Sequence, residues 1–341
     1  MMIDPFTQAM LDYQKHLRQG GKRIILPSPQ RSGSKGLMYM SGVGPGQCPR
    51  KQTYQAEQSA GVREPDFTPG PLDSLTHQSG DLIADFLAEA LAFGGHLIGD
   101  TYGYEVSVTW PDTNPYFTGR VDHLVDADTM PELVQEWGLR PRTLIVGDAK
   151  TTMGMNLKKH PKRWYVGQVE MYISALVDSG QAEEWGFKHV QPAIYQTTRS
   201  AMDKFMLLTW IWRDNGDCDV MRYGYKVPHK TFFNQSDEWQ RDVGLAYRWR
   251  QMVEQSGWEV AARHRPGRVA ERPELHRPDA GGKGWPFICC GQKWDDNGKI
   301  VKGMYEVHCP FFHTCWETGG DFTQFRWGSV INPADIPAIP F

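Results

Sequence analysis

Two short segments constrain the fold of this chain more than any other feature, because each places an acid at the end of a strand-like run. They are residues 118–122 (Thr-Gly-Arg-Val-Asp) and residues 144–150 (Leu-Ile-Val-Gly-Asp-Ala-Lys). Side chains two positions apart point to the same face of a strand, so Asp148 and Lys150 project together. Two acids and a lysine on neighbouring strand ends are typical of a hard-cation site beside a phosphate. The pattern therefore favours metal-dependent phosphodiester cleavage.

Each polar residue of these segments has a chemical role in that hypothesis. Asp122 and Asp148 would hold Mg²⁺ or Mn²⁺ with several waters left in place. The backbone carbonyl of Ala149 is a natural further oxygen ligand. Lys150 would hold the nucleophilic water or stabilise charge on the phosphorus, while the metal lowers the pKa of a bound water.

Other residues could complete such a site. Gln168 and Tyr172 are four residues apart on an expected helix and so share one of its faces, from which they could orient Lys150 or contact a phosphate. A histidine could supply a third metal ligand, and three candidates compete for this role: His77, His96 and His123. His123 adjoins the first acid, but strand alternation would point it to the opposite face.

Composition places the chain among ordinary globular proteins. It has 341 residues, of which 40% are hydrophobic and 23% charged, and a net charge of -3. No apolar run approaches about 20 residues and no secretory signal opens the sequence, so we expect a cytoplasmic protein without a membrane span. The net charge gives no general support for nucleic-acid binding. A local basic cluster after the second acid is the candidate DNA contact: Lys158, Lys159, Lys162 and Arg163.

Periodicity and turn residues predict a mixed α/β sheet flanked by helices. We expect helices at 5–19, from Pro49, at 73–93, 162–178 and 237–260, and strands at 102–110, 117–126, 143–150, 189–197 and 205–213. Residues 261–284 are rich in Arg, Pro and Gly and predict a linker, followed by an irregular tail. The chain would then comprise an N-terminal segment (1–72), a core (73–260), and a linker with a cysteine-rich region (261–341).

The cysteines suggest a second metal site. There are six of them: Cys48, Cys218, Cys289, Cys290, Cys309 and Cys315. In a reducing compartment, clustered thiols indicate a metal more often than disulfides. Zinc bound by four cysteines, or by three with His308 or His313, is one option. Cys218 lies between two aspartates in an expected turn, and we expect it to be a free thiol that does not bind the metal.

The order of these motifs resembles the RecB-like branch of the PD-(D/E)XK nucleases. The matching features are His77 on a helix, residues 119–122 (Gly-Arg-Val-Asp), residues 148–152 (Asp-Ala-Lys-Thr-Thr), and Gln168 with Tyr172. The resemblance implies a restriction-endonuclease-like mixed central sheet. It also implies that His77, Asp122 and Asp148 are metal ligands, that Lys150 is catalytic, and that Gln168 and Tyr172 support the active site. Glu105 looks like a further acid of this family's core.

The cysteines extend the resemblance to the iron–sulfur members of the family, such as the AddB nuclease subunit and the CRISPR-associated adaptation exonucleases. Those proteins carry one cysteine before the nuclease core and three after it. Here Cys48 precedes the core in a Cys-Pro-Arg-Lys segment, and Cys309, Cys315 and either Cys289 or Cys290 follow it. The spacing before Cys309 is longer than usual, which leaves the choice open. Four thiolates suit a [4Fe-4S] cluster, with Zn²⁺ as the alternative.

By resemblance, then, the chain would be a Mg²⁺- or Mn²⁺-dependent deoxyribonuclease. The family implies an exonuclease on single-stranded DNA ends in recombination, repair or phage DNA processing. A helicase or recombination partner would unwind duplex, because the chain has no P-loop. Two alternatives stay open: a catalytically inactive DNA-end-binding or assembly module on the nuclease fold, and a zinc-stabilised structural protein.

Overall fold

The computed structural model describes residues 5–27, 37–42, 48–66, 71–100, 102–109, 117–152, 163–198, 208–212, 218–222, 225–229, 237–266, 290–294, 300–307, 309–311, 314–315 and 330–331. The chain forms two compact units. Unit 1 comprises Met1–Ser34, Tyr39–Pro45 and Thr76–Gln240, and unit 2 comprises Lys35–Met38, Gly46–Leu75 and Arg241–Phe341.

Unit 1 is built on a mixed sheet with the strand order β1-β3-β4-β5-β6-β7-β8, in which β2 also pairs with β3. The strands are β1 Met38–Tyr39, β2 Tyr104–Thr109, β3 Phe117–Asp126, β4 Thr143–Thr152, β5 His189–Thr198, β6 Leu208–Trp212, β7 Cys218–Arg222 and β8 Tyr225–His229. The pair β4–β5 is parallel, whereas β2–β3, β3–β4 and β5–β6 are antiparallel. The later pairs β6–β7 and β7–β8 are antiparallel as well.

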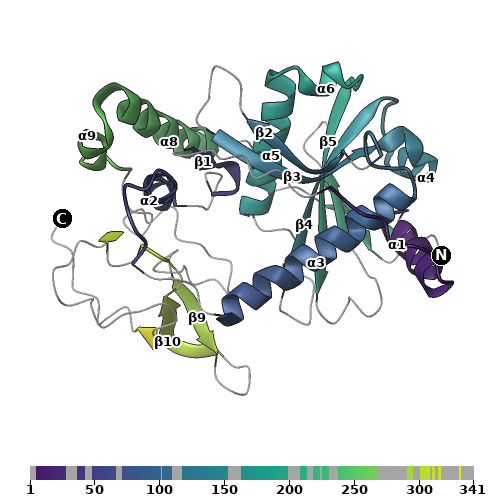
Figure 1. The fold of residues 1–341 in the computed structure, drawn as a ribbon, viewed down its shortest axis with the longest axis horizontal. Helices are drawn as coiled ribbons and strands as arrows, with labels where there is room; N and C mark the ends of the chain where they lie inside the picture. Colours follow the sequence, from purple (N-terminus) through teal and green to yellow (C-terminus); the bar gives the residue numbers. More distant parts are fainter. Residues whose placement is uncertain are drawn as a thin grey trace. The chain divides into compact units, whose positions relative to one another are not determined.

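Helices cover the sheet of unit 1 (Figure 1). They are α1 Pro5–Arg18, α3 Pro71–Phe93, which begins within unit 2, α4 Pro131–Trp137, α5 Arg163–Asp178 and α6 Gln181–Glu184. Side chains of α1, α3 and α4 form one buried cluster with Ile145 of β4 and Ala193 and Tyr195 of β5. Alternate positions of β4, such as Asp148, face the other way and meet Gln168 of α5. The sheet therefore lies between two helical layers.

Unit 2 combines helices from distant parts of the sequence with a small sheet. Its helices are α2 Pro49–Ser59, α8 Asp237–Ser256, which begins in unit 1, and α9 Trp258–Ala262. The sheet has the order β11-β10-β9, formed by β9 Cys290–Trp294, β10 Ile300–Val307 and β11 Val330–Ile331. Trp249 of α8 is buried, and its indole N–H donates to the carbonyl of Ala261.

The predicted mixed α/β sheet with flanking helices is confirmed, and most expected elements agree with the structure to within a few residues. The predicted helix 237–260 is divided, because Gly257 at a φ of 82° ends α8 before α9 begins. The expectation of an irregular tail was wrong. Residues 290–294, 300–307 and 330–331 are antiparallel strands. Their stability comes from mutual pairing, and the short segments carry little alternation of their own. Most of the predicted linker, from residue 267, lies outside the described residues.

Within the described part of the chain, no helix is both long enough and apolar enough to cross a membrane.

Candidate active site

The centre of the candidate site is the carboxylate of Asp148 on β4. This side chain is completely buried. The ammonium nitrogen of Lys150, two residues along the same strand, lies 2.7 Å from each of its carboxylate oxygens. The amide of Gln168 on α5 donates to Oδ1 at 3.1 Å. The Lys150 side chain is 19% exposed, so the ion pair joins a buried carboxylate to an ammonium group that solvent can reach.

The sheet brings Asp122 to the same place. The antiparallel pairing of β3 and β4 runs as far as His123 opposite Gly147. Continuing that register by one residue sets Asp122 opposite Asp148. The backbone N–H of Ala149 donates to Oδ2 of Asp122 at 2.7 Å. Two acids from separate segments therefore meet on adjacent strands, as the sequence predicted.

Burial controls the charges at this site. Burial raises the pKa of Asp148 to about 7, and repulsion from Asp122 adds to the shift, although Lys150 opposes it. Burial alone would lower the pKa of Lys150, but attraction by Asp148 and Asp122 outweighs it and raises the pKa. Lys150 is consequently a firmly charged ammonium group, suited to stabilising negative charge and unsuited to accepting a proton near neutral pH.

Gln168 and Tyr172 form a supporting pair on one face of α5. The Gln168 amide donates to the hydroxyl of Tyr172 at 2.7 Å as well as to Asp148. Tyr172 is buried, and burial raises the pKa of its hydroxyl. Its ring fits closely against Gly119, where a Cβ atom would lie 2.3 Å from the ring carbon Cε1. The small residue before Arg120 therefore makes room for the tyrosine that fixes Gln168.

Glu105 extends the row of acids to a third strand. Its neighbours Tyr104 and Val106 pair with His123 and Val121, so Glu105 falls opposite Asp122. It adopts a left-handed conformation, with a φ of 52°, which is uncommon for a residue with a side chain. Its carboxylate pairs with Arg120. Such backbone outliers cluster at functional sites.

The structure separates two of the candidate histidines from this site. His123 is completely buried, its Nε2 lies 3.0 Å from the carbonyl of Ala84 on α3, and burial lowers its pKa. It therefore faces the layer opposite α5, as alternation predicted. His96 contacts the Thr129 hydroxyl through Nδ1 at 3.0 Å. His77 lies within α3, but its side chain lies outside the described ones, so its role stays a prediction.

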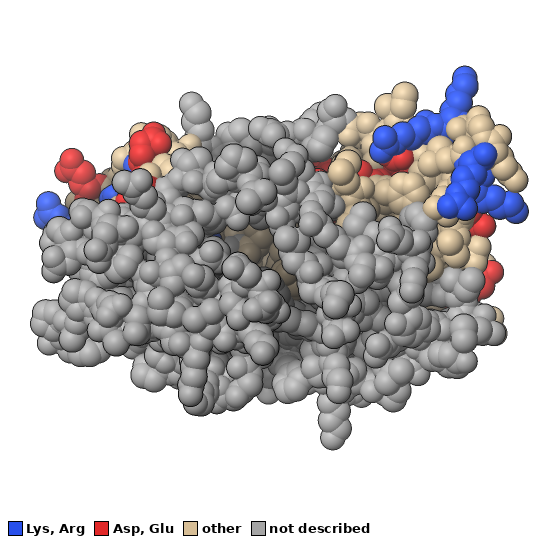
Figure 2. All heavy atoms as spheres, turned by 90° about the horizontal axis from the view of Figure 1, so that it is seen from below, with Lys and Arg blue, Asp and Glu red and all other residues tan. Residues whose placement is uncertain are grey.

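The predicted DNA-contacting cluster lies almost wholly outside the described residues. Lys158, Lys159 and Lys162 belong to the undescribed segment between β4 and α5, and Arg163 is the first residue of α5. Figure 2 shows Lys, Arg, Asp and Glu side chains together among the described residues of one face. A DNA contact of these four residues stays a prediction.

Three of the predicted cluster cysteines fall in two segments of unit 2 that contact each other. Cys48 directly precedes α2, while Cys309 and Cys315 flank a short turn. Asp66 joins the segments: its N–H donates to the Pro310 carbonyl at 2.8 Å, and its carboxylate accepts from the backbone N–H of Thr314 at 2.8 Å.

Aromatic and electrostatic contacts reinforce this junction. The rings of Tyr54 and Phe311 lie 5.4 Å apart, and burial raises the pKa of Tyr54, with a further contribution from Cys315. Of the remaining cysteines, Cys290 begins β9, Cys289 lies outside the described residues, and Cys218 begins β7. The ligand set and the choice between iron–sulfur and zinc therefore stay predictions.

Among the described side chains, no group of three or more His, Cys, Asp or Glu residues is arranged to hold a metal ion. The described cysteines Cys48, Cys309 and Cys315 are among these side chains. At the acid row, Lys150 pairs with Asp148 and Arg120 pairs with Glu105. Sequence reasoning did not single out Arg120 or Tyr165, whose ring lies 5.3 Å from the Lys150 ammonium. The position of Arg120 two residues before Asp122, on the same face of the strand, was the available signal.

Comparison with models of protein families, with curated proteins and with solved structures found no match to this chain.

Proposed function

We propose that the protein is a Mg²⁺- or Mn²⁺-dependent DNA nuclease, with a restriction-endonuclease-like core and a preference for single-stranded ends. The observation that carries the proposal is the row of acids across β2, β3 and β4, with the Lys150 ammonium on the buried Asp148 carboxylate. A salt bridge that served stability alone would have little reason to place the partly buried carboxylate of Asp122 beside the buried carboxylate of Asp148. Perturbed carboxylates of this kind concentrate at functional sites.

The donor set fits a hard divalent cation. Asp148 is fully desolvated, and repulsion from the neighbouring Asp122 raises the pKa of Asp148 further. A cation between the two carboxylates would offset both the desolvation of Asp148 and this repulsion. Asp122, Asp148 and the Ala149 carbonyl would hold the ion, with His77 as the further ligand that the resemblance implies. When bound, the ion would lower the pKa of a water and place positive charge beside the phosphate.

The protein's own residues have separate tasks in this proposal. Lys150 stabilises the negative charge that develops on the scissile phosphate or orients the attacking water, because its raised pKa keeps it protonated. Gln168 fixes the rotamer of Asp148 and is itself fixed by Tyr172. The basic residues Lys158, Lys159, Lys162 and Arg163 would contact the DNA backbone, and a helicase or recombination partner would supply unwound ends.

A [4Fe-4S] cluster is the proposed cofactor of unit 2, with Zn²⁺ as the alternative. Cys48, Cys309, Cys315 and one of Cys289 and Cys290 would hold it. The contact of Tyr54 with Phe311 is consistent with this, because it brings the turn that carries Cys309 and Cys315 against α2, the helix that Cys48 precedes.

One observation favours a second candidate function, a catalytically inactive DNA-end-binding module. Lys150 donates to Oδ1 of Asp148 and lies 2.7 Å from Oδ2, so the carboxylate has a cation without a metal, although Oδ2 has no hydrogen-bond partner. A nuclease fold that had lost metal binding would benefit from such a pair, because it neutralises the buried charge.

Digestion of 5′- and 3′-labelled single-stranded oligonucleotides with Mn²⁺ tests the proposal. We expect the wild type to shorten the strands and Lys150→Ala to lose about 100-fold or more of the rate, as when one charge-stabilising donor is removed. Lys188→Ala, which removes an exposed lysine of the same unit, is the matched control. Binding without cleavage, unchanged in Asp148→Ala, would support the inactive module instead.

A further inference from the structure

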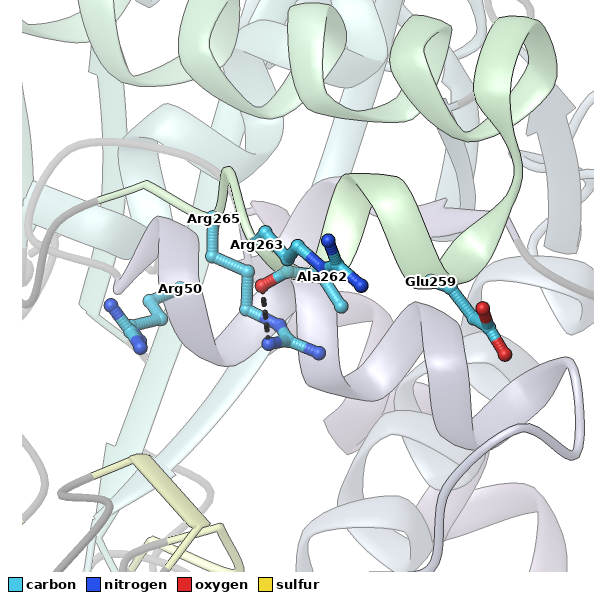
Figure 3. Close-up of a pocket in the computed structure, with 5 residues that line it drawn as sticks. All are labelled: Arg50, Glu259, Ala262, Arg263 and Arg265. Carbon is cyan, nitrogen blue, oxygen red and sulfur yellow. Dashed lines mark hydrogen bonds between the residues drawn. The ribbon is translucent and has the colours of Figure 1, made fainter.

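Unit 2 contains a pocket that the proposed nuclease chemistry does not use. It has a volume of about 730 Å³ and is lined by Arg50, Glu259, Ala262, Arg263 and Arg265 (Figure 3). Arg50 comes from α2, and the other residues come from α9 and the turn that follows it. The pocket is open to solvent, and its volume is in the range of small-ligand sites, roughly 300–1,000 Å³. Three guanidinium groups and one carboxylate make its lining strongly polar.

Arg265 is held rigidly at the wall of this pocket. Its guanidinium lies over the Tyr54 ring, 4.6 Å from the centroid, and its Nη1 donates to the Ala262 carbonyl at 2.7 Å, the dashed line in Figure 3. It also pairs with Glu57. The side chain is only 8% exposed, yet its Nε–H is buried without a hydrogen-bond partner. A buried donor without a partner is costly, so a further acceptor close to Arg265 would stabilise it.

Among the described residues, the arginines around the pocket outnumber the acids. Glu57 is almost completely buried and faces two guanidinium groups, those of Arg63 and Arg265. Arg263 is exposed, and among the described residues it pairs with no carboxylate. Among the described residues that line the pocket, Glu259 is the one acid beside three arginines.

We propose that this pocket binds a phosphate group carried by a nucleotide or by a DNA strand. Guanidinium groups recognise phosphate through paired N–H donors, and Arg50, Arg263 and Arg265 line one pocket from two segments. The Nε–H of Arg50 also donates to the Tyr54 hydroxyl at 3.2 Å. The volume exceeds the need of a bare phosphate ion, and Glu259 can accept a hydrogen bond from a sugar hydroxyl or a base. The proposal does not depend on catalysis in unit 1.

Calorimetric titration of the full-length protein in metal-free buffer tests this site. We expect dTMP to bind, inorganic phosphate to compete with it, and thymidine to give no response. Arg263→Gln should weaken dTMP binding about tenfold, because one charged hydrogen-bonding partner is lost. Arg248→Gln, at an exposed arginine of α8 outside the pocket, is the matched control and should leave the affinity unchanged.

Three outcomes would overturn the proposal: no binding of dTMP, equal binding of thymidine, or equal affinities of the two arginine variants. Binding at the acid row of unit 1 would respond to Lys150→Ala and not to Arg263→Gln, so the two sites are distinguishable. Hexathymidylate with and without a 5′-phosphate identifies the source of the phosphate. Stronger, Arg263-dependent binding of the phosphorylated strand than of dTMP assigns the site to strand ends, and the reverse assigns it to free nucleotides.

Discussion

Replacement of Asp148 by asparagine should change how the stability of the protein depends on pH. Burial raises the pKa of Asp148 from 3.8 to about 7. Between these values the folded protein keeps a proton that the unfolded chain releases, so stability falls as the pH rises through this window and is level above it. About three pH units at about 1.4 kcal/mol each give an upper limit of about 4 kcal/mol for this loss.

Asparagine does not titrate, so the variant escapes that loss. The difference in unfolding free energy, variant minus wild type, should increase by about 2–3 kcal/mol between pH 5 and pH 7 and then stay constant to pH 8. In the variant Lys150 loses the attraction of Asp148 but keeps that of Asp122. The cost of removing its partner enters as a constant offset as long as Lys150 stays charged between pH 5 and pH 8.

Urea unfolding followed by tryptophan fluorescence at pH 5, 6, 7 and 8 measures this difference, in buffer without divalent cations. Asp81→Asn removes an exposed carboxylate from α3 and controls for the change in net charge. A difference that does not vary with pH, or one that matches the control, would refute the conclusion that burial holds a proton on Asp148.

The remaining predictions concern the two units separately. Gly119→Ala should destabilise the protein by about 1–3 kcal/mol in urea unfolding, because the new methyl group overlaps the Tyr172 ring; unchanged stability would contradict the close fit. Cys315→Ser should abolish the absorbance near roughly 400 nm expected of an iron–sulfur protein, whereas Cys218→Ser should retain it. A colourless wild type, prepared without oxygen and holding one zinc ion, would instead support the zinc alternative.

The parts of the fold that sequence could predict are those whose patterns are local. The helix over 73–93 and the strands over 117–126 and 143–150 have clear apolar periodicity, and the structure places them at 71–93, 117–126 and 143–152. The tail was misjudged because β9 and β10 exist through pairing with each other. Neither segment has a distinctive hydrophobic pattern of its own, and the pairing of two strands cannot be predicted from the local sequence of either one.

The same distinction holds at the candidate site. Spacing alone predicted that Asp148 and Lys150 project together, and their 2.7 Å contacts agree with it. The sequence placed Asp122 and Asp148 on neighbouring strand ends, but the pairing of the two positions needed the register of β3 against β4, which no single segment contains. The contact between Gly119 and Tyr172 could not be predicted from the sequence either, because it depends on how α5 packs against the sheet.

The ion pair at Asp148 makes metal affinity a competition. Any divalent ion that binds Asp148 must replace interactions with Lys150 that already stabilise the buried charge. The repulsion from Asp122 favours the ion, since one monovalent ammonium cannot neutralise two carboxylates. Removal of Lys150 would therefore separate affinity from catalysis: metal binding should be maintained or strengthened while cleavage is lost. If the protein is the inactive module, removal of Lys150 would leave the buried Asp148 carboxylate without a cation. Asp148 would then take up a proton, and no divalent ion would bind.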